Sequence, residues 1–529
     1  MNKTRVPKAS PDALPELAAF LEPFAPLFRR HTSRDSMERY LTGLLTDLPH
    51  KTADTIAAAV AGTSTERLQH LLTDAAWDAQ ALDEARVQRL LAIHPPTSGV
   101  LVFDDTGLPK KGTESVGVEP QYSGTLGKIG NCQVVVSAEY LADDPTSSTP
   151  FHWPVSAQLF VPESWVADDE RRKRTHVPAE LGEQTKPEIA LGLLDLARQW
   201  GMPIQAVVVD AGYGDNPNFL AGLDERQVPY VCAVQSTFGV RLPDEVRAAK
   251  EHLPTYGGRG QPRKPRPAPL YSVKELIEAQ PEDAWQTIGW REGTKGTMQA
   301  QVLALRVHWA TGSQLHSTSH SRVHTGPEGW LLAERPVPAP TSQESATTEP
   351  LPQDGTAKQE AAGEQTAEKT KYWFSSLPPN TSLERLVTLA HARWVIEQFY
   401  EDAKQECGLD DFQGRRWDGL HRHLVLVMLA YSFLALQRLQ LPLPVGEAFP
   451  PPQSRVARCL TSIARYCSGS SRISSSGSFR PTRSRPFALA ETNKVVLAAD
   501  RHNNSVCKKV FLAPFIYQMK RYFGRQAIS

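Results

Sequence analysis

The first 94 residues carry the apolar spacing of amphipathic helices. Large apolar side chains recur three and four positions apart through 36–48 and again through 66–93, which is the period of one helical face. Pro95 and Pro96 follow directly and would end the last of these helices. The pattern therefore predicts an all-α N-terminal domain over residues 1–94.

The pattern changes to that of short strands after the two prolines. Three apolar runs separated by turn-forming segments are typical of an antiparallel meander, and they cover 98–105, 132–142 and 153–161. A helix follows, because Thr185 and Glu188 have the spacing of a capping box and Gly201 stands where a helix-terminating glycine belongs.

A nearly continuous apolar run then occupies 204–214, as expected of a strand that is covered on both faces. A helix at about 217–226 and a strand at 229–235 complete a βαβ unit. The order of three strands followed by alternating helices and strands predicts an α/β fold, with a mixed sheet flanked by helices on both sides.

Beyond residue 240 the chain departs from this plan. Strand-like runs at 285–290 and 299–310 indicate a β-rich insertion. Helical periodicity returns over 382–406 and in a long apolar helix at about 419–439. The predicted organisation has six segments: the helical domain 1–94, a core in two parts at 95–240 and 371–445, the insertion 241–334, a linker without large apolar residues at 335–370, and a basic, low-complexity tail at 446–529.

Composition excludes several classes of protein. The longest apolar run, Leu424 to Leu436, is shorter than the roughly 18 residues of a membrane span and is better interpreted as a buried helix. The N-terminus lacks a continuous apolar segment, so we expect no signal peptide and no membrane partner. Six scattered cysteines without metal-site spacing fit a reducing cytoplasm.

The net charge of the chain is zero, with 58 basic and 58 acidic residues, so it is not a uniformly basic DNA-coating protein. The charge is uneven, because the tail at 446–529 holds 14 basic and 3 acidic residues. Any binding of nucleic acid must therefore come from local patches.

Acidic residues mark the ends of two predicted strands. Asp104 and Asp105 close the first strand, and Asp210 closes the strand at 204–214. Open α/β sheets place functional groups at such ends, although an Asp there also commonly begins a turn. Neither interpretation is favoured by one strand alone.

The predicted helix at 382–406 carries a polar stripe. Arg393, Glu397, Tyr400 and Lys404 are spaced four, three and four apart and share one helical face. A solvated face stabilised by ion pairs would give the same spacing. Taken by itself, the helix favours that simpler interpretation.

Taken together, three segments of the chain favour a functional site over these simpler interpretations. FDDTGLPKKG, VVVDAGYGD and RWVIEQFYEDAK, in that order, resemble the DDE transposases of bacterial insertion sequences, and in particular the insertion-sequence 701 family. That group has an Arg-x3-Glu-x6-Lys signature, which Arg393, Glu397 and Lys404 reproduce. Its usual Tyr three residues before the Arg is missing, because Ala390 stands there.

The resemblance implies an RNase H-like core interrupted by a β-rich insertion. It assigns Asp210 and Glu397 as the second and third metal ligands, and Asp104 or Asp105 as the first. Side chains of adjacent strand residues point to opposite faces, so only one of these two can readily face the metals. We favour Asp104, because Asp104 and Thr106 match the group's Asp-x-Thr pattern.

The family chemistry is phosphodiester transfer with two Mg²⁺ ions, for which Mn²⁺ is an accepted substitute. The expected activity is cleavage at the ends of the element and joining of the freed 3′-OH to target DNA. Arg393 and Lys404 are expected to contact phosphates, and Lys110 and Lys111 to contact the DNA backbone. By the same resemblance, the helical domain 1–94 is expected to bind DNA and read the terminal inverted repeats. The expected partners are these repeats, target DNA and a second copy of the chain, bound as a homodimer on DNA in the bacterial cytoplasm and nucleoid.

Other residues give weaker signals. A basic loop with Arg259, Arg263, Lys264 and Arg266 fits DNA contact and a solvated linker equally. Core packing is favoured over base stacking for the insertion tryptophans, which are Trp285, Trp290 and Trp309, and the signal of His421 and His423 is too weak for a metal site.

Two other functions stay open. A catalytically decayed copy would act only as a DNA-binding protein, and a frameshift near residue 450 would explain the unusual tail. An RNase H-like nuclease would hydrolyse DNA without joining it.

Overall fold

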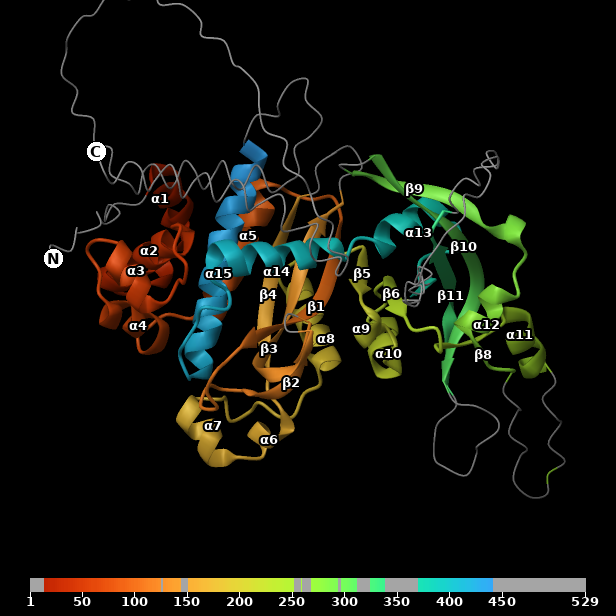
Figure 1. The fold of residues 1–529 in the computed structure, drawn as a ribbon, viewed down its shortest axis with the longest axis horizontal. Helices are drawn as coiled ribbons and strands as arrows, with labels where there is room; N and C mark the ends of the chain where they lie inside the picture. The colour runs from red at the N-terminus through yellow and green to blue at the C-terminus, as the bar shows by residue number, and fades with distance from the viewer. Residues whose placement is uncertain are drawn as a thin grey trace, which may run out of the picture.

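The computed structural model describes residues 14–124, 127–143, 151–251, 258, 268–293, 296–311, 324–337 and 370–440. The predicted linker lies almost entirely outside the described residues, and so do the four basic residues of the 259–266 loop and the tail at 446–529. Figure 1 shows the described part as helices beside a long twisted sheet.

The centre of the molecule is a mixed sheet. It is built from β1 (Gly99–Pro109), β2 (Glu119–Ser123), β3 (Lys128–Ala142), β4 (His152–Phe160), β5 (Ala206–Val209) and β6 (Tyr230–Val234). β1, β3 and β4 form the predicted antiparallel meander, and β1, β5 and β6 run parallel. This α/β arrangement is consistent with the RNase H-like prediction.

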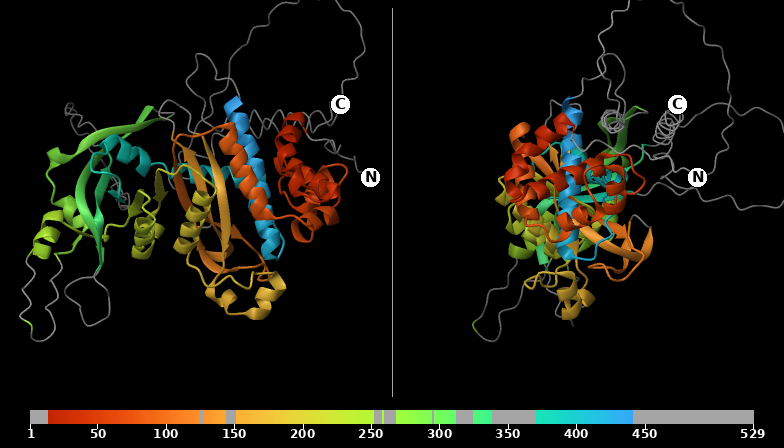
Figure 2. Two further views of the ribbon diagram at one scale, coloured as in Figure 1. Left: turned by 180° about the vertical axis from the view of Figure 1, so that it is seen from behind. Right: turned by 90° about the vertical axis from the view of Figure 1, so that its left-hand side faces the viewer.

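Helices cover both faces of this sheet. α8 (Lys186–Gln199) and α10 (Pro217–Glu225) lie on one face, and α14 (Trp394–Cys407) and α15 (Trp417–Gln440) lie on the other (Figures 1 and 2). All four residues of β5 are buried, because both faces of this strand are covered. α8 begins at the predicted capping box, and Gly201 beyond its end has the positive φ of a terminating glycine.

The N-terminal region is mainly helical, as its periodicity predicts. Its elements are α1 (Pro15–Leu21), η1 (Glu22–Leu27), α2 (His31–Leu45), α3 (Ala53–Ala59), α4 (Thr65–Thr73) and α5 (Ala79–Ile93). α5 is joined closely to the sheet. The fully buried guanidinium of Arg86 is paired with Asp83 and donates to the carbonyl oxygens of Pro154 and Val155 in β4.

α15 is the long apolar helix predicted from the sequence. Its segment Trp417–Leu439 is long and apolar enough to cross a membrane, but 89% of that window is buried inside the protein. α15 packs against β4, α5 and α14, which accounts for its apolar character on all sides.

His421 and His423 have structural partners on α15. His423 hydrogen bonds to the hydroxyl of Tyr40 and to the carbonyl of Gly408, and His421 accepts the N–H of Leu159. Burial lowers the pKa of both histidines to about 4. Neutral rings of this kind serve as packed hydrogen-bonding groups.

A second group of strands extends the sheet. It contains β7 (Gly239–Arg241), β8 (Tyr271–Ser272), β9 (Gln286–Gly293), β10 (Gly296–Thr311), β11 (His324–Arg335) and β12 (Lys371–Ser375), with α11 (Pro243–Glu251), α12 (Val273–Glu278) and η2 (Glu282–Ala284). β12 pairs with β6 on one side and with β11 on the other. One twelve-stranded sheet therefore runs through the core and the insertion.

Two local expectations are corrected. Asp104 and Asp105 do not end their strand, because β1 continues antiparallel to β3 as far as Pro109. On the side of β1 that pairs with β5, the two acids lie beyond the end of the neighbouring strand, because β5 stops at Val209. The helical stretch 382–406 is also divided, because a turn at 391–393 separates α13 (Leu383–Ala390) from α14.

The small α6 (Glu163–Val166), α7 (Asp169–Thr175) and α9 (Ala211–Gly214) complete the described elements. α6 and α7 connect β4 to α8, and α9 follows β5 directly. β1, β4 and β5 run in the same direction, so these connections lie at the same end of the sheet, where the three strands finish (Figure 1).

Candidate active site

Two of the three predicted acids lie on neighbouring parallel strands. Val102 of β1 is opposite Val208 of β5, and Asp104 and Asp210 each follow two residues later. Asp210 lies one residue beyond the end of β5, and its charge is close enough to Asp104 to raise the pKa of that acid. The carboxylate of Asp210 also caps α9, because it accepts the backbone N–H groups of Gly212 and Tyr213 at 2.9 and 3.3 Å.

Asp104 faces α14. Its side chain is 16% exposed, and its Oδ2 lies 2.7 Å from Nη1 of Arg393. Burial raises the pKa of Asp104 to about 7, with the charges of Asp210 and Asp105 adding to this effect and that of Arg393 opposing it. The positive charge of Arg393 therefore does not fully offset the cost of burying the ionised carboxylate of Asp104.

Arg393 pairs with two of the three predicted acids. The other nitrogen of its guanidinium lies 2.5 Å from Oε1 of Glu397, one turn along α14. Burial alone would lower the pKa of Arg393, but the charges of Asp104, Glu397 and Asp210 raise it above its ordinary value. The guanidinium therefore acts as the counter-ion of the acid cluster.

Tyr400 and Lys404 attach the same face of α14 to β1. The hydroxyl of Tyr400 donates to the backbone oxygen of Asp104 at 2.8 Å and lies 2.6 Å from the hydroxyl of Ser137 on β3. Nζ of Lys404 donates to the hydroxyl of Thr106 at 2.7 Å. Burial lowers the pKa of Lys404 to about 8. The polar stripe predicted on this helix therefore faces the sheet.

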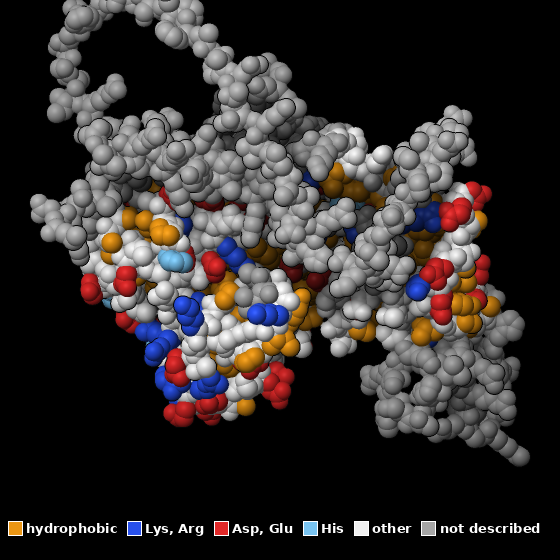
Figure 3. Space-filling model, in the orientation of Figure 1, with side chains coloured by type: hydrophobic (Ala, Val, Ile, Leu, Met, Phe, Trp, Pro, Cys, Tyr) orange, Lys and Arg blue, Asp and Glu red, His pale blue; other side chains and the backbone are white. Residues whose placement is uncertain are grey.

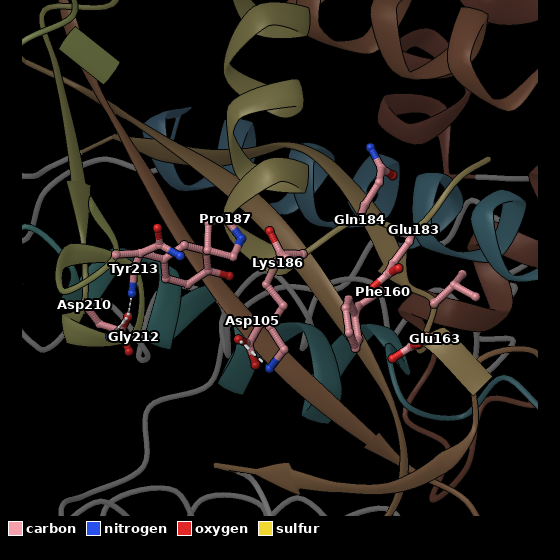
Figure 4. Close-up of a pocket in the computed structure, with 13 residues that line it drawn as sticks. Asp105, Phe160, Glu163, Glu183, Gln184, Lys186, Pro187, Asp210, Gly212 and Tyr213 are labelled. Carbon is pink, nitrogen blue, oxygen red and sulfur yellow. Dashed lines mark hydrogen bonds and ion pairs between the residues drawn. The ribbon is translucent and has the colours of Figure 1, made fainter. Parts of the chain in front are cut away.

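Asp105 points to the opposite face, as the alternation of strand side chains predicts. Its Oδ2 lies 3.0 Å from Nζ of Lys186, the first residue of α8. This pair lines a cavity of about 510 Å³. Asp210 also lies in its wall (Figure 4). Asp105 and Asp104 are thus bound to cations on the two different faces of β1.

The two lysines after the first acids lie differently. Nζ of Lys110 donates to the backbone oxygen of Phe412, and burial lowers the pKa of this lysine. Lys111 is exposed. Lys110 therefore binds the segment that leads into α15, and only Lys111 projects from the surface.

The tryptophans of the insertion also have defined surroundings. Trp309 is almost completely buried, in agreement with the core packing predicted for it. Trp290 of β9 stacks face to face on His391, with ring centroids 3.9 Å apart. Arg291 lies over the ring of Trp394 at 4.7 Å. β9 therefore contacts the chain on both sides of Arg393.

The donors suit a divalent metal ion, although they are not yet arranged around one. Hard carboxylate oxygens are the ligands that Mg²⁺ prefers, and Asp104, Asp210 and Glu397 supply them from three elements. Among the described residues, no three acidic, His or Cys side chains converge as a metal site. The reason is visible in the ion pairs, because Arg393 lies between Asp104 and Glu397.

Sequence reasoning did not identify Lys186. It precedes Pro187 in the first turn of α8, where nothing in its spacing relates it to an acid 81 positions earlier. Tyr400 was recognised as part of the polar stripe, but its bond to the backbone beside Asp104 could not be inferred from helical spacing.

Comparisons with known proteins agree with the family resemblance. A family model described as DDE superfamily endonuclease matches residues 23–297, which is more than half of the chain. A second model, Transposase DDE domain, matches residues 181–433. The chain therefore belongs to the DDE superfamily of endonucleases, as the resemblance predicted.

One relative is similar to part of the chain. The chain is 31% identical over 207 residues to the probable transposase for insertion sequence element IS701 from Microchaete diplosiphon. The match covers 39% of this chain and 50% of the relative, so the chain spans about half the length of the relative that it matches.

Proposed function

We propose that this protein is a DDE transposase with an RNase H-like core, which cleaves DNA at the ends of an insertion sequence and joins the freed 3′-OH to target DNA. The observation that carries the proposal is the pairing of Asp104 on β1 and Glu397 on α14 with one guanidinium, that of Arg393, whose pKa is also raised by the charge of Asp210 after β5. The similarity to a probable transposase supports the same activity.

Asp104, Asp210 and Glu397 would hold two Mg²⁺ ions in this proposal. When bound, the ions stabilise charge on the attacking and leaving oxygens of an in-line displacement at phosphorus. Arg393 would leave the carboxylates as the ions enter and bind a phosphate of the DNA instead. Its planar fork of donors suits a phosphate as well as it suits the two carboxylates.

Other residues of the chain would orient the DNA and the acids. Tyr400 holds the β1 backbone at Asp104, so it fixes the acid relative to α14. Lys404 lies at Thr106, one turn of α14 from Tyr400, where it would contact a further phosphate. Lys111 is exposed for a contact with the DNA backbone, and Lys110 would first have to leave Phe412.

The reaction needs no energy source besides the DNA itself. Water attacks the phosphodiester at the end of the element and releases a 3′-OH. That hydroxyl then attacks a phosphodiester of the target, so one P–O bond forms as another breaks. Joining both ends in one event calls for two active sites, and we therefore propose a homodimer on DNA, acting in the bacterial cytoplasm.

A cleavage and joining assay tests this function. It uses DNA carrying the element's ends, Mg²⁺ or Mn²⁺, and the variants Glu397→Gln, Asp104→Asn and Asp105→Asn. Glu401→Gln is the matched control, because Glu401 lies one turn further along α14. We expect cleavage and joining to be lost in Glu397→Gln and Asp104→Asn and retained in the control.

The other outcomes identify the alternatives. Loss in Asp105→Asn with activity in Asp104→Asn would make Asp105 the first ligand. Cleavage without joining by the wild type would indicate a hydrolytic nuclease. Binding of the ends without cleavage would indicate a decayed copy.

A further inference from the structure

The cavity on the α8 face of β1 is not explained by the three acids. It measures about 510 Å³, which is within the range of pockets that receive small ligands. Its walls come from the end of β4, from α6, from the start of α8 and from the turn after β5 (Figure 4). Asp210 forms part of the wall, so the cavity opens directly beside the acid cluster.

Lys186 is the one cation among the residues that line this cavity in the described part of the chain. Its ammonium lies 3.0 Å from Asp105 and 5.9 Å from the ring centroid of Phe160. The side chain keeps 31% of its surface exposed. Lys186 can therefore pair with Asp105 and still present its charge to a ligand in the cavity.

The position of Lys186 complements that of Lys404. Lys404 contacts Thr106 from the α14 face of β1, whereas Lys186 contacts Asp105 from the α8 face. Asp210 is close to both regions, because its charge acts on Asp104 and its side chain lines the cavity. A DNA strand whose reacting phosphate lies at the acids thus has a cation available on each side.

We propose that the cavity receives a nucleotide next to the reacting phosphate, and that Lys186 binds its phosphodiester group. This inference rests on the proposed function, since it takes DNA as the ligand. A lysine binds phosphate as a compact point charge, and each such contact releases counter-ions from DNA. Phe160 and Val161 supply an apolar wall against which the sugar or base would pack.

The chain that continues from the cavity carries charges of both signs. α6 contributes Glu163 to the wall and leads into α7, where Lys173 and Arg174 are exposed. Figure 3 shows Lys and Arg side chains interspersed with acidic ones at this end of the molecule. The cavity also has mixed charge, because it is lined by Lys186 together with Asp105, Glu163, Glu183 and Asp210, but Lys186 is the cation that lies beside the acid cluster.

The first measurement is the salt dependence of DNA binding by the full chain in EDTA, which prevents cleavage. Fluorescence anisotropy would use a labelled duplex carrying an element end with its flanking DNA. We expect Lys186→Gln to weaken binding roughly tenfold at 0.1 M salt and to reduce the salt slope by about 0.9. Lys186→Arg should retain most of the affinity.

Lys274→Gln is the matched control. Lys274 is an exposed lysine on α12 that pairs with Glu278 at 3.7 Å, so it also loses a carboxylate partner when changed. Its salt slope should equal that of the wild type. Thermal unfolding of each variant would show whether the fold is intact.

A methylphosphonate scan would locate the contact. Replacing one DNA phosphate at a time by an uncharged methylphosphonate should reveal a position, close to the reacting phosphate, that weakens the wild type roughly tenfold and does not affect Lys186→Gln. Equal slopes for Lys186→Gln and wild type, or the absence of any such position, would overturn the inference.

These experiments distinguish failure of the role of Lys186 from failure of the proposed function. If the wild type binds the DNA end and cleaves it with metal, while Lys186→Gln binds identically, only the role of Lys186 fails. If the wild type neither binds nor cleaves the DNA end, the proposed function fails with it.

Discussion

At the scale of single residues, burial of the acidic side chains opposes their ionisation, and the charge of Arg393 favours it. Asp104 is largely buried, and the guanidinium of Arg393 offsets only part of the cost of burying its charge, to which the nearby charge of Asp210 adds. Such sites are commonly less stable than the fold would otherwise allow, because they are arranged to bind something else.

The stability of the metal-free protein should therefore depend on Asp104. Its folded-state pKa of about 7 lies above the ordinary value, so the neutral acid suits the fold, and this stabilisation is lost as the pH rises through 7. We expect the advantage of Asp104→Asn over wild type to grow by about 2–3 kcal/mol between pH 5 and pH 8. Urea unfolding in EDTA at both pH values measures it, and identical pH profiles would contradict the prediction.

Arg393 should compete with metal ions for the carboxylates. Removing its charge in Arg393→Gln leaves Asp104 and Glu397 without their shared cation, so Mn²⁺ binding without DNA should become roughly tenfold tighter. Isothermal titration calorimetry measures the dissociation constant directly.

Arg385→Gln is the control for this change, because Arg385 pairs with Asp143 and not with the acid cluster. Its affinity for Mn²⁺ should equal that of the wild type. Unchanged or weaker Mn²⁺ binding by Arg393→Gln would show that the arginine does not occupy the metal position.

At the scale of elements, the placement of α14 depends on the insertion. Trp290 stacks on His391, and Arg291 lies over Trp394, so β9 holds the turn that contains Arg393. His391 is held on its other side by a 2.6 Å hydrogen bond to Glu334 of β11. The insertion thus contributes to the position of α14 although it provides none of the three predicted acids.

Trp290→Ala should consequently affect the reaction more than the fold. Loss of one stacked pair costs about 0.5–1.5 kcal/mol of stability, but a displaced α14 should slow cleavage at least roughly tenfold. Trp290→Phe, which keeps an aromatic ring, should restore most of the rate. Single-turnover cleavage and thermal unfolding of the three proteins would test this, and a rate that falls only with the stability would contradict it.

At the scale of the whole molecule, β12 unites two groups of strands. Its main-chain groups bond to β6 on one side and to β11 on the other, so it is a central strand of the twelve-stranded sheet. Phe374 of β12 is fully buried and contacts both Tyr230 and Phe238. The insertion is therefore packed as part of the same sheet.

Core and insertion should then unfold together. Hydrogen exchange in the metal-free protein should show the amides of β6, β12 and β11 opening with one common free energy, because none of these strands can separate without breaking the ladder of another. Mass spectrometry of exchanged peptides resolves the three strands. A clearly lower opening free energy for β11 would instead identify the insertion as an independent unit.

The sequence by itself predicted most elements, because these depend on local patterns. Alternating and helical periodicities report which side of each segment is buried, and they located the meander, the βαβ unit and the apolar helix α15 correctly. Spacing likewise placed Arg393, Glu397 and Lys404 on one helical face. Strand alternation also showed that Asp104 and Asp105 point to opposite faces.

Only the tertiary structure decided which helix and which cation lie on each side of β1. Asp104 pairs with Arg393 across 289 positions of the chain, and Asp105 with Lys186 across 81. The continuation of β1 past the acids and the bridging by β12 likewise depend on neighbouring strands from distant parts of the sequence. Periodicity records whether a position is buried, but the partner that buries it is set by the topology of the sheet.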